Sequence, residues 1–113
     1  MSTIFKDIID KKFKTTLIHE DDICVAFNDI NPIAPVHILI VPKKEIPTIN
    51  NLNKEDNEIV GHLIYIAKEI AKEKNIDENG YRLIFNCNED GGQSVYHIHL
   101  HLIGGRKFNW PPG

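Results

Sequence analysis

The 113 residues of the chain suffice for one domain of common size, and 42% hydrophobic with 26% charged residues is typical of a globular protein in water. A formal net charge of −3 argues against a nucleic-acid surface, and no apolar stretch is long enough to span a bilayer. We therefore expect a single domain over residues 1–113 that binds neither nucleic acid nor membrane.

The N-terminus and the cysteines bear on location. Residues 1–7 contain no long apolar run and so predict no secretory signal. Cys24 and Cys87 each lie in an apolar run without CxxC spacing, which favours two free buried thiols over a disulfide or a metal pair. These features predict a protein of the cytoplasm, with the nucleus as the alternative.

Hydrophobic periodicity predicts the elements in chain order. The run 36–41 is apolar on both faces, as in a central strand, and Pro42 closes it. Asn53 is a good N-cap for the longest helix. The expected elements are a short helix over 4–12, strands over 15–19, 23–27 and 36–41, a long helix over 53–74, strands over 81–87 and 95–103, and an irregular tail over 106–113. Together they predict an α+β domain, with a mostly antiparallel sheet and the long helix packed on one face.

Three histidines alternate with apolar residues in the last expected strand, at His97, His99 and His101. Because alternate side chains of a strand share a face, the imidazoles should line one side while the residues between them anchor the strand in the core. The pattern places titratable, nucleophilic groups where generic polar residues normally stand.

A glycine-rich loop precedes this row at residues 90–94. Consecutive glycines let the backbone approach a ligand and turn N–H groups inward, which forms an anion-binding concavity. Ser94 adds a hydroxyl and Gln93 an amide. The segment predicts a phosphate held beside the imidazoles.

Residues 91–102, GGQSVYHIHLHL, resemble the signature of the histidine triad (HIT) nucleotide-binding proteins, a His-x-His-x-His pattern with interleaved apolar residues. Further segments resemble the Hint branch of that family in order, and the likeness covers essentially the whole chain. They are 27–30, 34–37, 41–44, 80–82 and 110–113.

The resemblance implies a HIT-like fold of about five antiparallel strands whose sheet continues across a homodimer. The tail 106–113 would lie near the partner's active site, with Trp110 reaching toward it. The implied activity is hydrolysis of the P–N bond of purine nucleoside 5′-phosphoramidates to AMP and an amine, with no cofactor and no metal.

Roles for the histidines also follow from the resemblance. His99 would be the nucleophile that forms a covalent nucleotidyl-histidine intermediate, which suits a neutral imidazole near pH 7. His101 or Ser94 would pass a proton to the amine. His37 would bond His99 and fix its tautomer, and His97 would support the row through the backbone.

The nucleotide contacts are implied in the same way. The α-phosphate would be bound by His101, Asn86, Ser94 and the Gly92 backbone, and the ribose hydroxyls by Asp29. The base would be lined by Phe5, Ile8, Phe27 and Ile30. Outside the row, His19 is expected at the surface and His62 in the long helix without a special role.

Three alternatives remain open at this point. The histidine row, with His37 in place of one member, could supply three nitrogen ligands to zinc. The fold could hydrolyse dinucleoside polyphosphates. The chain could also be a regulatory module that binds nucleotides without catalysis.

Overall fold

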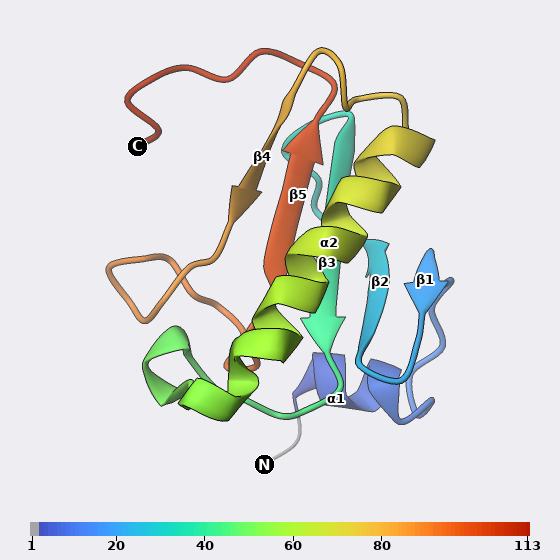
Figure 1. Ribbon diagram of the computed structural model, residues 1–113, viewed down its shortest axis with the longest axis vertical. Helices are drawn as coiled ribbons and strands as arrows, with labels where there is room; N and C mark the ends of the chain where they lie inside the picture. Colours follow the sequence, from blue (N-terminus) through green and yellow to red (C-terminus); the bar gives the residue numbers. More distant parts are fainter. Residues whose placement is uncertain (1–2) are drawn as a thin grey trace.

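Five strands form one antiparallel sheet with helices on its two faces in the computed structural model, which describes residues 3–113 (Figure 1). Met1 and Ser2, which open the segment that predicts no secretory signal, lie outside the described residues. The sheet order is β1-β2-β3-β5-β4. The expected α+β architecture, with one long and one short helix, is confirmed. The elements are α1 (Ile4–Ile9), β1 (His19–Glu20), β2 (Cys24–Asn28), β3 (Val36–Pro42), 3-10 turns Ile49–Asn51 and Lys54–Asp56, α2 (Asn57–Glu73), β4 (Tyr81–Ile84) and β5 (Leu100–Gly104).

Strand β3 is central, and its residues alternate between two hydrophobic clusters. Ile38 and Ile40 face α2, whereas Leu39 and Val41 face α1. The antiparallel register places Leu39 opposite His101 and Ile40 opposite Leu100. Because paired residues share a face, His101 lies on the α1 side of the sheet.

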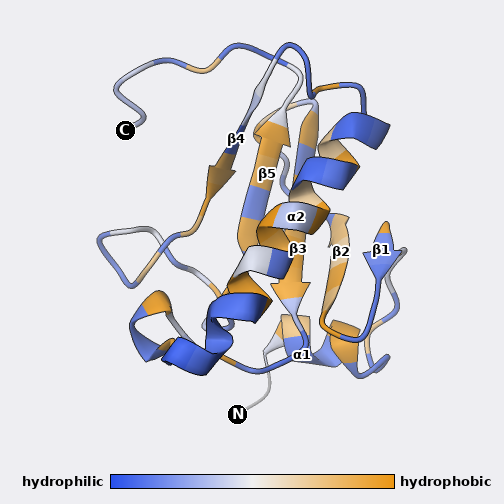
Figure 2. Cartoon of the chain, in the orientation of Figure 1, coloured by the Kyte–Doolittle hydropathy of each residue, from blue (hydrophilic) through white to orange (hydrophobic). Residues whose placement is uncertain are grey.

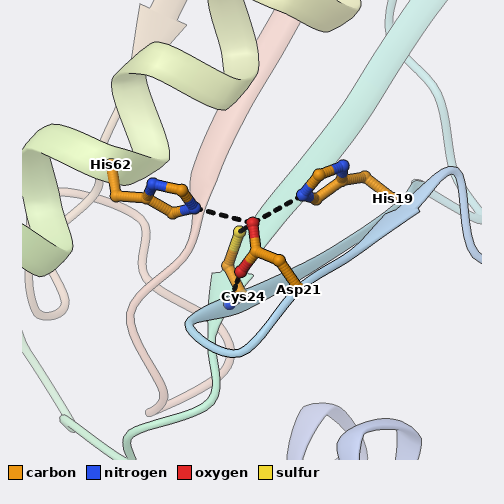
Figure 3. Close-up of side chains that lie close together, drawn as sticks. All are labelled: His19, Asp21, Cys24 and His62. Atoms are coloured by element: carbon orange, nitrogen blue, oxygen red, sulfur yellow. Dashed lines mark hydrogen bonds and ion pairs between the residues drawn. The ribbon is translucent and has the colours of Figure 1, made fainter.

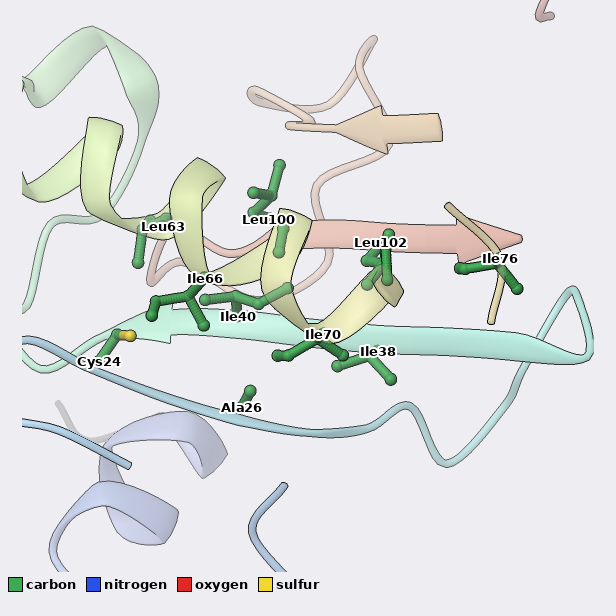
Figure 4. Packing of buried hydrophobic residues seen from close by; sticks show 12 residues of the cluster. Cys24, Ala26, Ile38, Ile40, Leu63, Ile66, Ile70, Ile76, Leu100 and Leu102 are labelled. Atoms are coloured by element: carbon green, nitrogen blue, oxygen red, sulfur yellow. The ribbon is translucent and has the colours of Figure 1, made fainter. Parts of the chain in front are cut away.

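Helix α2 lies across β3 and β5 and covers one face of the sheet (Figure 1). Leu63, Ile66 and Ile70 recur at helical spacing and pack on the strands, while the outward side of the helix is mostly hydrophilic apart from the exposed Ile64 and Tyr65 (Figures 2 and 4). Leu63 is fully buried, so its truncation to Ala would cost about 2–5 kcal/mol. This packing holds β3 and β5 in a fixed relation to each other.

Helix α1 packs against the other face, in a smaller cluster. Thr3 caps the helix, because its hydroxyl accepts the Lys6 N–H at 3.1 Å. Phe5 and Ile8 are buried against Phe27 and neighbouring side chains of β2 and β3. The helix therefore covers only part of this face, and its edge borders a cavity.

The strand expected over 95–103 is shorter than predicted, since β5 begins at Leu100. Continuing the β3–β5 pairing would set Ile98 opposite Pro42, which has no N–H to donate. The Ile98 N–H instead bonds the Ile46 carbonyl at 2.8 Å, which draws the chain away from the sheet. The strand expected over 81–87 correspondingly ends at Ile84, the residue paired with His101.

The first expected strand is also displaced. Residues 15–18 form no regular strand, and β1 covers only His19–Glu20. The Asp21 carboxylate accepts the N–H groups of Ile23 and Cys24, which closes a tight turn into β2. Within residues 3–113, no helix is long and apolar enough to cross a membrane.

Candidate active site

A cavity of about 310 Å³ opens on the α1 side of the sheet, between α1, the ends of β2 and β5, and the segment before β5. Its walls are mostly apolar, and its polar groups include His99, His101, Asp29 and Ser94. An apolar cavity with a few converging polar groups is the usual form of a small-molecule site.

His99 is held by the backbone just before β5. Its Nδ1 lies 2.8 Å from the His97 carbonyl oxygen, and because a carbonyl only accepts, Nδ1 carries the proton. The neutral ring therefore keeps an unprotonated Nε2. The Phe5 ring contacts the imidazole edge-to-face at 4.8 Å between centroids. This contact orients the ring and keeps water from one side of it.

His37 bonds His101, with 3.0 Å between His37 Nε2 and His101 Nδ1. This corrects the expectation that His37 bonds His99. The Ile33 N–H donates to His37 Nδ1 at 3.2 Å, so His37 carries its proton on Nε2 and donates it to His101 Nδ1. Neutral His101 then carries its own proton on Nε2. That Nε2 is buried without a partner, which makes it an available donor in the site.

His97 is separated from the other two imidazoles. It is fully buried, and its Nε2 lies 2.7 Å from the Pro42 carbonyl oxygen, to which it donates. The expected row along one strand face is therefore wrong in this respect, because His97 and His99 precede β5 and their side chains diverge. Only His99 and His101 remain adjacent, with ring centroids 4.9 Å apart.

The pKa values of His97, His99 and His101 are all lowered. Burial lowers the pKa of His97 and of His99 below the ordinary value. Burial, followed by the neighbouring His99 and His37, lowers the pKa of His101 to about 4. Neutral imidazoles therefore prevail near pH 7, and a neutral ring can act as a nucleophile or as a hydrogen-bond donor.

Asp29 follows β2 and closes the network at the cavity wall. One carboxylate oxygen accepts the Asn31 N–H at 2.8 Å, and the other lies 3.3 Å from His37 Nε2. The Asp29, His37 and His101 side chains offer ligand atoms within 4.8 Å of one another. This trio differs from the predicted zinc-binding row, since neither His97 nor His99 belongs to it.

The glycine-rich loop keeps its shape through its own hydrogen bonds. The Gly92 N–H donates to the Glu89 carbonyl, so it is not free for the phosphate contact expected of it. The buried Gln93 amide donates to the carbonyls of Pro47 and Val95, and its oxygen accepts the Asn88 N–H. Gln93 thus stabilises the loop through these hydrogen bonds, whereas the sequence suggested that its amide would contact the ligand.

Most of the predicted site residues meet at this cavity. His37 lies behind it, while Asn86 and Gly92 are not part of its lining. Ile30 is 89% exposed and forms part of the rim. Trp110 lies in the tail and is 82% exposed, with the guanidinium of Arg82 in β4 lying 5.9 Å from the centre of its ring. The predicted residues that line the cavity are Phe5, Ile8, Phe27, Asp29, Ile30, Ser94, His99 and His101.

Further lining residues escaped the sequence analysis. The alternation of β3 points Leu39 to the same side as His37, so Leu39 could have been found. Of the others, Val95 and Asn28 fall within the family-like segments 91–102 and 27–30 without a role having been assigned to them, and the rest lie in loops or in α1 without a motif. These other lining residues are Ile4, Phe13, Thr15, Asn28, Asn31 and Val95.

The sequence and the fold both match a known family. The HIT domain family model matches residues 10–108, and the chain therefore belongs to the HIT domain family. An uncharacterized HIT-like protein of Synechocystis sp. is 46% identical over 111 residues, which cover 98% of this chain and 96% of that protein.

Solved structures agree in fold. The HIT family hydrolase of Legionella pneumophila Philadelphia 1 superposes with a TM-score of 0.96 at 48% identity, covering 99% of this chain and 100% of that one. The histidine triad nucleotide-binding protein of Candida albicans gives 0.83 at 29% identity, covering 97% and 83%. The chain thus shares its architecture with a hydrolase and with a nucleotide-binding protein.

Proposed function

We propose that this protein is a purine nucleoside 5′-phosphoramidase of the Hint branch, which hydrolyses adenosine 5′-monophosphoramidate-type P–N bonds to AMP and an amine. The observation that carries the proposal is the His99 Nδ1–His97 carbonyl bond, which leaves an unprotonated Nε2 beside the free Nε2–H of His101. The hydrolase and nucleotide-binding relatives support the reaction class.

In the first step, His99 Nε2 attacks the α-phosphorus, a bond between Nε2 and phosphorus forms, and the P–N bond of the substrate breaks. The amine leaves with one added proton. In the second step, water attacks the same phosphorus, the Nε2–phosphorus bond breaks and AMP departs; the proton released by the water balances the one taken up by the amine, and neutral His99 is restored. Covalent catalysis of this kind divides one difficult displacement into two easier ones.

The His101 imidazole and the Ser94 hydroxyl can donate hydrogen bonds or a proton during this reaction. The Nε2–H of His101 faces no protein partner, so it serves the phosphoryl oxygens, where negative charge gathers in the transition state. Because the pKa of His101 is about 4, its cationic form is scarce at neutral pH. The Ser94 hydroxyl is then the better route for a proton to the departing amine.

The apolar part of the cavity suits a purine base. Phe5, Ile8 and Phe27 provide its floor, and the exposed Ile30 provides a rim. Asp29 is at the mouth, where its carboxylate can accept hydrogen bonds from the ribose hydroxyls.

A homodimer belongs to this proposal. The tail is fixed to its own chain by Arg82, whose guanidinium donates to the Asn109 carbonyl and lies near the Phe108 ring. Trp110 remains exposed at its end, as expected for a side chain that contacts a partner's active site. Two unpaired cysteines also support a cytoplasmic protein.

The decisive experiment is single-turnover trapping with an adenosine phosphoramidate. Because the P–N bond of a nucleotidyl-histidine is acid-labile, the reaction is quenched in alkaline denaturant; wild type should then carry one adenylyl group on His99, and His99→Ala should lose turnover yet still bind AMP. Wild-type kcat in His99→Ala, or turnover without an adenylylated protein, would refute the proposal. Faster turnover of a diadenosine polyphosphate would instead assign the protein to the alternative hydrolase class.

A further inference from the structure

A second cluster of metal-ligating side chains lies on the opposite face of the sheet from the cavity. His19, Asp21 and Cys24 come from the β1–β2 hairpin, and His62 comes from the first half of α2 (Figure 3). As expected, His19 is partly exposed and His62 lies in the long helix, but both contact Asp21, which was not expected. Both rings point at one carboxylate.

The geometry converges on a single oxygen atom. Asp21 Oδ2 lies 2.6 Å from His19 Nε2, 2.7 Å from His62 Nε2 and 3.7 Å from Cys24 Sγ (Figure 3). The four potential ligand atoms all lie within 4.8 Å of one another.

The carboxylate is held in place from behind. Its other oxygen, Oδ1, accepts the Ile23 N–H at 2.7 Å and the Cys24 N–H at 2.8 Å. Oriented in this way, Asp21 must direct Oδ2 toward the two rings and the thiol. Hydrogen bonds that fix a carboxylate ligand are a regular feature of the shell around metal sites.

We propose that His19 Nε2, Asp21 Oδ2, Cys24 Sγ and His62 Nε2 bind one Zn²⁺ ion. Two imidazoles, a thiolate and a carboxylate are all ordinary zinc ligands, and four protein ligands make a closed, structural site. The ion would fasten the hairpin to α2, joining residues that are 41 positions apart in the sequence.

The distances allow tetrahedral coordination after a small adjustment. Zinc–nitrogen and zinc–oxygen bonds of about 2.0–2.2 Å set neighbouring ligands roughly 3.3 Å apart, so each ring must recede by roughly 0.6 Å. The side chains of His19 and His62 are 30% and 27% exposed, which leaves them free to move outward. Cys24 already has the spacing expected of a sulfur ligand.

The carboxylate and the thiol enter the site in different protonation states. Although burial opposes it, hydrogen bonds from His19 and His62 hold the pKa of Asp21 well below its usual value. Burial, followed by the Asp21 charge, raises the pKa of the Cys24 thiol to about 12. Formation of the Zn–S bond therefore releases the thiol proton to solvent.

The site lies apart from the proposed catalytic chemistry. Cys24 packs in the cluster under α2, whereas His99 and His101 face the cavity on the α1 side. Zinc at this cluster should therefore raise stability and leave kcat unchanged.

Cobalt titration of the metal-free full-length protein tests the assignment, because a tetrahedral Co²⁺–thiolate complex absorbs in the near-ultraviolet and visible. Wild type should bind one equivalent with a thiolate charge-transfer band that zinc abolishes. His62→Gln should weaken binding at least about tenfold, and Cys24→Ser should lose the band. Cys87→Ser is the matched control for the thiol and should keep it.

The melting temperature provides a second readout. Excess Zn²⁺ should raise it in wild type and in His37→Gln, which disrupts the other potential ligand trio, but not in His62→Gln. An equal zinc shift in wild type and His62→Gln, or a cobalt complex without a thiolate band, would overturn the proposal.

Discussion

His37 and His101 are joined ring to ring, with 3.0 Å between Nε2 of the first and Nδ1 of the second. The bond settles which nitrogen of His101 bears the proton, while His99 takes its orientation from the backbone of His97. Two neighbouring imidazoles thus hold opposite tautomers. One presents a lone pair and the other presents an N–H.

Replacement of His37 tests this division. His37→Phe removes the donor, leaves His101 Nδ1 unpaired and releases its tautomer, which should cost about 1–3 kcal/mol in kcat/KM. The loss should fall mainly on kcat, because the nucleotide does not contact His37. His37→Gln, whose amide can donate near the Nε2 position, should recover part of the activity. Steady-state kinetics of both variants check this, and equal losses would contradict a positioning role.

Acid should destabilise the protein through its neutral histidines. His101 titrates near pH 4 in the fold but near 6.5 when unfolded, so between these values the unfolded chain binds more protons. The stability that neutral His101 contributes is fully present above about pH 6.5 and is lost as the pH drops toward 4. Because the imidazole keeps some solvent contact, we expect acid to lower the free energy of unfolding through His101 by about 1–2 kcal/mol. This corresponds to a melting temperature lower by about 4–8 °C.

Thermal melts of wild type and His101→Gln across this range measure the effect. The variant should show a shallower dependence, while the buried His97 and His99 keep part of the slope. The groups that face His101 are His99, His37 and Asp29. Asp21 does not affect this measurement, because the stability that its ionised carboxylate contributes is lost only below the ordinary Asp pKa of 3.8. Identical slopes would contradict the assignment.

Two glycines should respond in opposite directions to the same substitution. A Cβ at Gly91 would lie 2.5 Å from the Cys87 carbonyl oxygen, so Gly91→Ala must displace the loop, at a cost of about 1–3 kcal/mol. At Gly61, an exposed helix position with open space, Gly61→Ala should stabilise by about 0.5–1 kcal/mol. Urea unfolding of both variants measures the difference, and a neutral Gly91→Ala would show that the close approach is unimportant.

Asp29→Ala should weaken binding of ribonucleotides by about 1–3 kcal/mol, because the carboxylate would no longer accept the ribose hydroxyls. Binding of the matching deoxyribonucleotide should change less, since it offers one hydroxyl fewer. Calorimetric titration of AMP and dAMP into wild type and variant compares the two. Equal affinity of wild type for both nucleotides would exclude the proposed contact.

The regular elements were readable from the sequence because their periodicity is strong. The run of β3, apolar on both faces apart from His37, and the stripe of α2 each predict one burial pattern, and the structure has both. The start of β5 was not readable. It depends on Pro42 facing Ile98, and that pairing is known only once the register of two strands is fixed.

The site was predictable in part for a similar reason. The alternation of histidines marks the segment, but spacing alone does not state which imidazole His37 will meet. The cluster at Asp21 was missed because it unites a hairpin with a helix turn far along the chain, and neither half carries a motif.

The alternation along β3 has a consequence for how the sheet assembles. If β5 paired with β3 one residue out of step, His101 would turn under α2 among Ile38 and Ile40, while Leu100 and Leu102 would be driven into the cavity. Such a misaligned sheet would bury an imidazole among hydrocarbon side chains, so His101, which is proposed to take part in the reaction, also disfavours the wrong pairing of β5 with β3.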